Sequence, residues 1–249
     1  MPHLNDAAIV LRRSDYAETS QILVLFLREH GKVHAIAKGV RRSTKQRFQP
    51  GIDLLESGRV VLSVRQLRQE AMATLVEWKP TRAPGGLHDR LDRLHSAVYV
   101  ADVTSRLTED WDAHPAVFDG LEASFAALAV VEQVLSVVTG YQRVVLNETG
   151  LMPRFDGCVG CGRAMPSERS VVFSSFEGGL VCRDCEPARV EKRTVRVPNE
   201  VLTGRKDARG AEIAGLFDLF HYHLSHVAGR EPACGAELTR LAAEMMRAR

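Results

Sequence analysis

The sequence predicts an α+β fold, in which a small β-barrel is followed by an α-helical domain that carries an inserted cysteine module. Three observations support this prediction. Apolar residues come in short strand-like runs at the N-terminus, they later recur with the period of a helix, and two Cys-x-x-Cys pairs interrupt the helical part. We therefore expect a barrel over residues 1–80, a helical domain over 81–249 and a cysteine module over 155–187.

Five short segments near the N-terminus have the composition of β-strands. Apolar and β-branched residues dominate these segments, which are Ala7–Arg13, Gln21–Leu27, Val33–Lys38, Arg59–Val64 and Ala71–Trp78. The turn residues Glu29–Lys32 predict that the second and third strands form a hairpin. Closure into a barrel removes exposed strand edges, and an OB-type barrel has about this size, although other small barrels also fit the strand count.

A break at residues 80–86, which include two prolines and two glycines, separates the strands from the helices. Apolar stripes with helical spacing follow it, at Leu87, Leu91, Leu94, Val98 and Ala101, at Val117, Leu121, Phe125 and Leu128, and at Val131, Val134, Leu135 and Val138. Gly150 is well placed to cap the last of these helices. Two more stripes start at Ile213 and Leu238, and we expect their helices to pack against those of residues 87–150.

The cysteine module contains Cys158-x-x-Cys161 and, twenty residues later, Cys182-x-x-Cys185. Each pair lets one tight turn direct two sulfur atoms at one point, and two such turns make a closed tetrahedral site that suits zinc. Because four protein ligands leave no open coordination position, we predict one structural zinc ion. Unliganded cysteines and a redox pair are the alternatives. Cys234 stands alone, and we expect an inert thiol.

A strongly basic segment follows the third predicted strand. It has five cations and no acid: Lys38, Arg41, Arg42, Lys45 and Arg47. Such a density of like charge suits a polyanion, because a phosphate backbone releases counterions when cations bind it. Together with Lys32, these residues are our candidate nucleic-acid contacts, and a merely solvated loop is the alternative. Phe48 can stack on a base, but packing against the barrel is the better interpretation.

The net charge of +2 implies no particular partner, but the charge is unevenly distributed. Residues 1–80 carry +5, residues 81–150 carry −5 and residues 151–249 carry +2. We interpret the acidic middle part mainly as a solvated face. The sequence has no apolar run long enough to span a bilayer and no secretory signal, so we expect a cytoplasmic protein with reduced thiols.

The sequence motifs of common enzymes are missing. The nucleotide-binding glycine patterns, His-Glu-x-x-His and Gly-x-Ser-x-Gly do not occur. His221, His223 and His226 lie close together on a predicted helix, but their spacing does not place them on one face. We therefore expect surface or capping positions for them rather than a second metal site. No catalytic residue can be named, and we predict that the protein is not an enzyme.

Several segments of the sequence carry a further signal, which is sharpest at Ala37–Arg42. The others are Ile9–Leu11, Tyr16–Glu18, Phe26–Lys32, Tyr141–Gly150, Cys158–Gly162 and Gly178–Cys182. Together they resemble the bacterial RecO family of recombinational DNA repair proteins. The resemblance implies an OB-fold, a helical domain and a zinc module, and it implies that Lys38, Arg41 and Arg42 lie on the DNA-facing side.

The resemblance also implies a function. Members of that family bind single- and double-stranded DNA, anneal complementary strands, and work with RecR to load recombinase onto strands covered by single-strand-binding protein. A DNA-binding recombination mediator is therefore the expected function. The residues alone leave two alternatives open: a zinc-ribbon RNA-binding module of an RNA-processing or translation assembly, and an enzyme with an unrecognised site.

Overall fold

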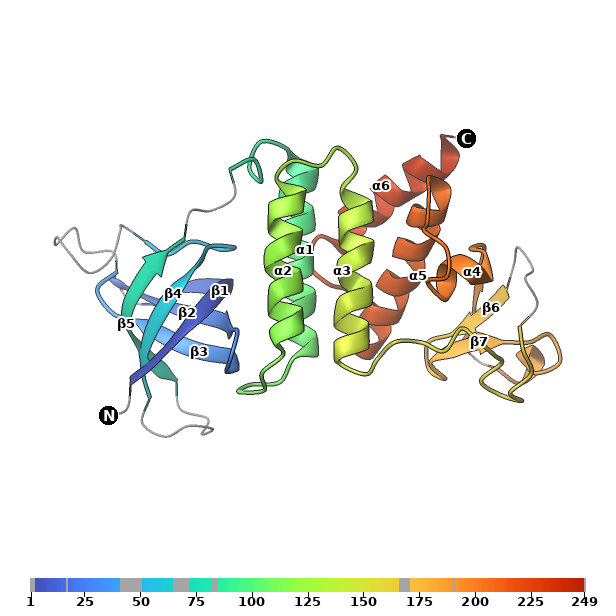
Figure 1. Cartoon of the computed structure of the whole chain (residues 1–249), viewed down its shortest axis with the longest axis horizontal. Helices are drawn as coiled ribbons and strands as arrows, with labels where there is room; N and C mark the ends of the chain where they lie inside the picture. Colours follow the sequence, from blue (N-terminus) through green and yellow to red (C-terminus); the bar gives the residue numbers. More distant parts are fainter. Residues whose placement is uncertain are drawn as a thin grey trace. The chain divides into compact units, whose positions relative to one another are not determined.

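The computed structural model describes residues 3–16, 18–40, 51–64, 72–81, 85–165, 171–189 and 191–248. The chain forms two compact units, Met1–Val131 and Glu132–Arg249. The first unit contains a β-barrel and two helices, and the second contains the remaining helices and a small sheet (Figure 1). None of the helices in the described residues has the length and apolar character needed to cross a lipid bilayer.

A closed five-stranded barrel begins the first unit (Figure 1). Its strands are β1 (His3–Tyr16), β2 (Ser20–Leu27), β3 (Gly31–Ala37), β4 (Ser57–Ser63) and β5 (Ala73–Pro80). The order around the barrel is β1-β2-β3-β5-β4, with β1 paired to both β2 and β4 and with β3 parallel to β5. This arrangement confirms the predicted OB-type barrel, and the register of β2 against β3 confirms the hairpin.

Alternation of side chains along the strands explains why this segment folds as a barrel. In β2, Leu23 and Leu25 point inward and are fully buried, whereas the alternating residues Ile22 and Val24 are partly exposed. A β-bulge between Val10 and Arg12 shifts the register of β1, which bends the strand. Trp78 of β5 is buried and belongs to the apolar core of the barrel.

Two helices, α1 (Leu91–Leu107) and α2 (Pro115–Leu128), complete the first unit and pack against each other. The predicted stripe of α1 was partly wrong, because Leu91 is 66% exposed whereas Arg93 is buried. The guanidinium group of Arg93 donates to the carbonyls of Ala129 (2.8 Å) and Val131 (3.1 Å), just after the end of α2. Arg93 therefore supplies hydrogen-bond donors to backbone carbonyls that follow the C-terminal end of α2. Apolar periodicity does not predict such a buried polar role.

Cations of the barrel pair with acids of the helices within this unit. Arg28 Nε and Nη2 donate to the two carboxylate oxygens of Asp119 in α2, at 2.8 and 2.9 Å. Lys32 Nζ lies 3.4 Å from a carboxylate oxygen of Asp110, in the segment after α1. The basic and acidic thirds of the sequence thus meet, in part, as ion pairs inside one folded unit.

The second unit contains α3 (Val134–Glu148), α4 (Asn199–Leu202), α5 (Ala211–Val227) and α6 (Gly235–Arg247). As predicted, the helix after the cysteine module returns to the earlier ones: α5 packs against both α3 and α6 (Figure 1). Between α3 and α4 in the sequence lies a sheet of β6 (Val171–Ser174), β7 (Gly179–Val181) and β8 (Arg193–Val195), in the order β7-β6-β8. The third strand lies beyond the predicted end of the cysteine module at residue 187.

The end of α3 agrees with the prediction, but its start does not. Gly150 has φ of +71° and donates its N–H to Asn147 O (3.1 Å), and the next amide donates to Leu146 O (2.8 Å). This is the Schellman pattern of a helix end, which confirms the capping role of Gly150. The helix begins at Val134, because the amide of Val131 still bonds to a carbonyl of α2.

Candidate metal centre and nucleic-acid interface

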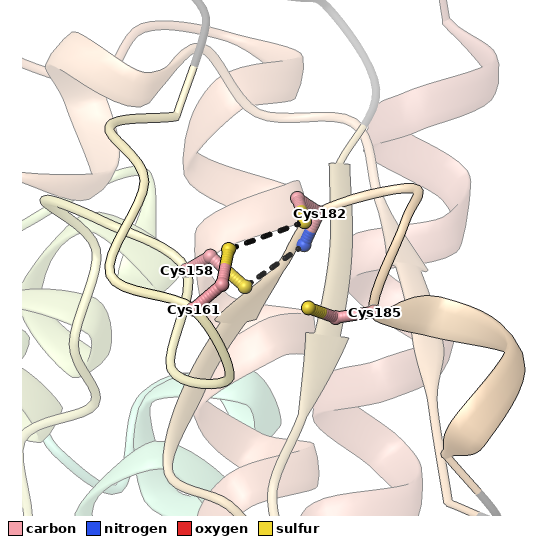
Figure 2. Close-up of side chains that lie close together, drawn as sticks. All are labelled: Cys158, Cys161, Cys182 and Cys185. Carbon is pink, nitrogen blue, oxygen red and sulfur yellow. Dashed lines mark hydrogen bonds between the residues drawn. The ribbon is translucent and has the colours of Figure 1, made fainter.

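The first cysteine pair lies in a tight turn. The amide of Gly162 donates to Cys158 O at 2.8 Å, and the amide of Cys158 donates to Arg163 O at 2.8 Å. Gly162 has φ of +74°, a backbone conformation that costs glycine little. The closed turn brings the sulfur atoms of Cys158 and Cys161 to the same side (Figure 2).

The second pair follows β7. Cys182 comes directly after this strand, and its carbonyl accepts bonds from the amides of Cys185 (3.0 Å) and Glu186 (2.9 Å). A third backbone bond, from Val159 N to Leu180 O at 2.9 Å, ties the first turn to β7. These backbone hydrogen bonds place the two turns next to each other.

The four sulfur atoms converge. All four Sγ atoms lie within 4.8 Å of one another and face a common space (Figure 2). The distance from Cys161 Sγ to Cys182 Sγ is 3.7 Å, far longer than the roughly 2.05 Å of a disulfide bond. Tetrahedral Zn–S bonds of about 2.3 Å would place sulfur atoms about 3.8 Å apart. The cluster can therefore hold one metal ion, and its donors are sulfur atoms alone.

The electrostatics of the cluster also suit a cation. Burial raises the pKa of the Cys158 thiol, but backbone hydrogen bonds, led by that of Cys182, outweigh it and lower the pKa to about 6. The amide of Cys182 lies 3.3 Å from Cys158 Sγ. Hydrogen bonds that the Cys185 thiol donates to the sulfur atoms of Cys182 and Cys161 raise the pKa of Cys185 to about 12. The thiolate of Cys158 thus forms readily at neutral pH, whereas the raised pKa of Cys185 means that its thiolate is favoured only with a cation beside it.

The cysteine module is anchored to α5 by buried polar groups that the sequence did not reveal. Ser175 Oγ lies 2.7 Å from His223 Nδ1, and His223 Nε2 lies 3.0 Å from Leu151 O. Glu191, just before β8, accepts a hydrogen bond from Tyr222 of α5. These contacts connect the sheet, the end of α3 and α5 within one unit.

The surface or capping role predicted for the three histidines was wrong for two of them. His221 and His223 are buried, and burial lowers the pKa of both imidazoles, whereas His226 is exposed. A signal was present, because His223 continues the helical stripe of Phe217 and Phe220. The cysteine outside the cluster, Cys234, is half-buried at the start of α6 with φ of +59°.

The predicted nucleic-acid contacts fall partly in the described chain. Lys38 is exposed directly after β3. Four others, together with Phe48, lie outside the described residues: Arg41, Arg42, Lys45 and Arg47. Lys32 has another partner, because its Nζ donates to Ser105 O (2.9 Å) and Thr108 O (2.7 Å) at the end of α1. A phosphate could reach Lys32 only by replacing these bonds.

Comparison with known proteins identifies the family of the chain. The model "Recombination protein O N terminal" matches residues 1–83, and "Recombination protein O C terminal" matches residues 88–205. The chain belongs to the RecO family. The two RecO matches adjoin between residues 83 and 88, where the barrel ends and the helices begin.

Individual RecO proteins resemble the chain over most of its length. The DNA repair protein RecO of Myxococcus xanthus is 33% identical over 208 residues, which cover 82% of this chain and 80% of that protein. The DNA repair protein RecO of Rhodopirellula baltica is 33% identical over 183 residues, which cover 73% and 67%. The DNA repair protein RecO of Alkaliphilus metalliredigens is 29% identical over 199 residues, which cover 78% of each. The chain is therefore a DNA repair protein of the RecO type.

Proposed function

We propose that this RecO-family protein binds single- and double-stranded DNA, anneals complementary strands and, together with RecR, helps to load recombinase onto strands covered by single-strand-binding protein. Family membership supports the role in repair. The observation that carries the DNA contact is the position of Lys38, which is exposed at the end of β3 where the chain continues into Arg41 and Arg42.

The five cations from Lys38 to Arg47 suit a phosphate backbone better than a base edge. Lys and Arg side chains neutralise phosphates and release counterions, so binding should weaken as salt rises. Phosphate contacts carry no base information, so the protein should accept any sequence. Neutralising two backbones at once lowers the repulsion between them, which favours annealing of whatever strands are present.

We assign one structural zinc ion to the cysteine cluster. Four thiolates complete a tetrahedral shell and leave no position for a substrate, so the ion would hold the two turns together and take no part in a reaction. Consistent with this role, no step of the proposed function requires hydrolysis by this chain. A cytoplasmic location fits a protein that acts on DNA and keeps four thiols reduced.

An annealing and binding assay tests the proposal. Lys38→Ala should weaken binding to single-stranded DNA and slow annealing of two complementary oligonucleotides. Lys79→Ala is the matched control, because Lys79 is an exposed lysine of the same barrel that pairs with Glu77. Equal effects of the two substitutions would contradict a specific role of Lys38. Stronger binding to RNA than to DNA of the same sequence would favour an RNA-binding module, and nucleotide hydrolysis would contradict the absence of catalysis.

A further inference from the structure

The small sheet of the second unit has an open edge at β8. The strand order β7-β6-β8 places β8 on the outside, and it pairs with β6 along one side only. Among the described residues, the backbone groups of Arg193–Arg196 have no hydrogen-bond partner outside the β6–β8 ladder. In an antiparallel pair, every second residue directs its N–H and C=O groups away from the partner strand. β8 therefore presents backbone donors and acceptors that an added strand can bind.

The opposite edge of the same sheet is closed. Leu180 of β7 donates its amide to Arg154 O (3.1 Å) and accepts a bond from the amide of Val159 (2.9 Å). The chain around the first cysteine turn thus pairs with β7 and protects it. Folded proteins usually protect both edges of a sheet, because an unpaired edge can bind another chain. No described segment pairs with the outer edge of β8.

A cavity of about 350 Å³ lies alongside the open edge. β8 lines one side of it, and the other side is formed by Ala211, Gly215 and Leu219 of α5 and by Met246 of α6. Ala211 and Gly215 lie one turn apart on α5, and their side chains are too small to fill the space. A short, charged strand can be an edge that merely avoids pairing. The cavity distinguishes β8 from such an edge, because it offers room for a side chain of an added strand.

Alternation along β8 determines what an added strand meets. Arg193 pairs with Asp218 of α5, so Val195, two residues later, also faces α5 and is buried. Thr194 and Arg196 lie on the other face and are exposed. A strand added to the sheet directs every second side chain toward α5, into the cavity, and the others outward beside Arg196.

Charge decides which kind of strand fits this edge. Lys192, Arg193 and Arg196 lie within five residues that contain no acid. Two of these cations pair with acids of the same unit, at 3.2 and 2.6 Å, whereas Arg196 pairs with none of the described residues. If a second copy of this chain added its own β8 antiparallel around Thr194, Arg196 of each copy would lie opposite Lys192 of the other. Like charges that face each other across a ladder are destabilising, so the edge suits an acidic strand.

We infer that the edge of β8 is a docking site for an extended acidic segment of a partner protein, which joins the three-stranded sheet as a further strand. Main-chain hydrogen bonds supply affinity, and the cavity selects apolar side chains at alternate positions of that segment. Its carboxylates face Arg196. A DNA strand is also a polyanion, but it has no amide groups to pair with the backbone of β8. The inference goes beyond the proposed function and does not depend on DNA binding.

Binding of a labelled peptide to the full, zinc-loaded chain tests this inference. The probe is a short peptide in which Glu alternates with Leu or Val, with both ends blocked so that no terminal charge contributes. Fluorescence anisotropy should show saturable binding, and the peptide should slow hydrogen exchange of β8 amides. A peptide of the same composition, with its Glu residues grouped at one end, is the control. It keeps the charge but loses the alternation, so it should bind about tenfold or more weakly.

Variants of the chain locate the bound peptide. Arg196→Glu reverses the unpaired charge and Ala211→Leu fills the cavity, and each should weaken peptide binding by about tenfold or more. Arg240→Glu and Ala236→Leu are the matched controls, because both positions are exposed on α6 and neither lines the cavity. Lys38→Ala excludes binding at the basic segment. All three of these proteins should bind the peptide like the wild type, and circular dichroism verifies that every variant is folded.

The other outcomes overturn the inference. A wild-type chain that does not bind the alternating peptide, or that binds the grouped peptide equally well, would exclude strand addition. Unchanged affinity in both Arg196→Glu and Ala211→Leu would place the peptide elsewhere. If Arg196→Glu instead lost affinity for DNA and the wild type did not bind the peptide, the edge would belong to phosphates. None of these results affects the DNA contact proposed for Lys38, which is measured with DNA alone.

Discussion

Arg12 of β1 donates a hydrogen bond of 2.5 Å to the buried carboxylate of Asp102 in α1. The same carboxylate also accepts a bond from Nε of Arg106, one turn further along α1. The contact ties the barrel to the first helix of its unit. Arg12 belongs to the basic third of the sequence, but in the fold its charge is balanced by an acid of the middle third.

We predict that Asp102 is important for the stability of the first unit. Asp102→Ala leaves Arg106, whose side chain is 12% exposed, without its carboxylate, and should lower the free energy of unfolding by about 3 kcal/mol. Asp119→Ala removes the exposed partner of Arg28 and should change stability little. Urea unfolding followed by tryptophan fluorescence measures both. Equal effects would show that burial of Asp102 contributes nothing.

We predict that Lys32 contributes to stability and Lys38 to DNA binding. Lys32→Ala removes donors to two carbonyls at the end of α1 and should cost about 1–3 kcal/mol of stability, with the salt dependence of DNA binding unchanged. Lys38→Ala should weaken DNA binding with stability unchanged, since the residue is exposed. Unfolding curves and binding isotherms of both variants check this. A stable Lys32→Ala protein with weakened DNA binding would instead support the DNA contact predicted from the sequence.

The cysteine cluster should contain one zinc ion per chain. Cys182→Ser leaves three sulfur ligands and should reduce the zinc content and destabilise the module while the barrel stays folded. Cys234→Ser is the control, because Cys234 lies outside the cluster, and it should keep full zinc content. Elemental analysis of purified, reduced protein measures both. Folded wild-type protein without zinc would contradict the assignment.

Stability of the second unit should fall in mild acid. Burial lowers the pKa of His223, so the folded protein binds this proton less readily than the unfolded chain does. Stability is therefore present above the unfolded pKa of about 6.5 and is lost as the pH falls toward the folded pKa. His223→Gln should show a smaller loss, measured by hydrogen exchange of α5 amides from neutral to mildly acidic pH. Zinc content is measured in parallel, and identical pH profiles of the two proteins would exclude His223 as the cause.

Much of the fold was predictable because its signals are local. Alternation in β2 reflects one buried face, and the spacing of the two cysteine pairs reflects the turns that bring their sulfur atoms together. By contrast, β8 is only three residues long and shows no periodicity. It forms because β6 pairs with β7 along one edge and can pair with β8 along the other. This second pairing depends on the folded sheet and not on the local sequence.

The residues that sequence reasoning misplaced have partners far away in the chain. In the sequence, nothing distinguishes Lys32 from the other cations near it. Its structural role comes from the carbonyls of Ser105 and Thr108, which lie 73 and 76 residues later. Arg93 and His223 are polar residues that are buried because distant backbone carbonyls accept their hydrogen bonds. Patterns of polarity along the chain predict that such residues are exposed, so their roles follow only from the tertiary structure.

The basic segment should bind DNA through phosphates, and the salt dependence of single-strand affinity measures these contacts. If each of the five cations from Lys38 to Arg47 neutralises one phosphate, the logarithm of the binding constant should fall with the logarithm of salt concentration with a slope of about −3.5. In a folded Arg41→Glu, Arg42→Glu double variant, the affinity should drop for every sequence and the slope should become shallower. The same affinity and slope in wild type and double variant would show that Arg41 and Arg42 make no phosphate contact.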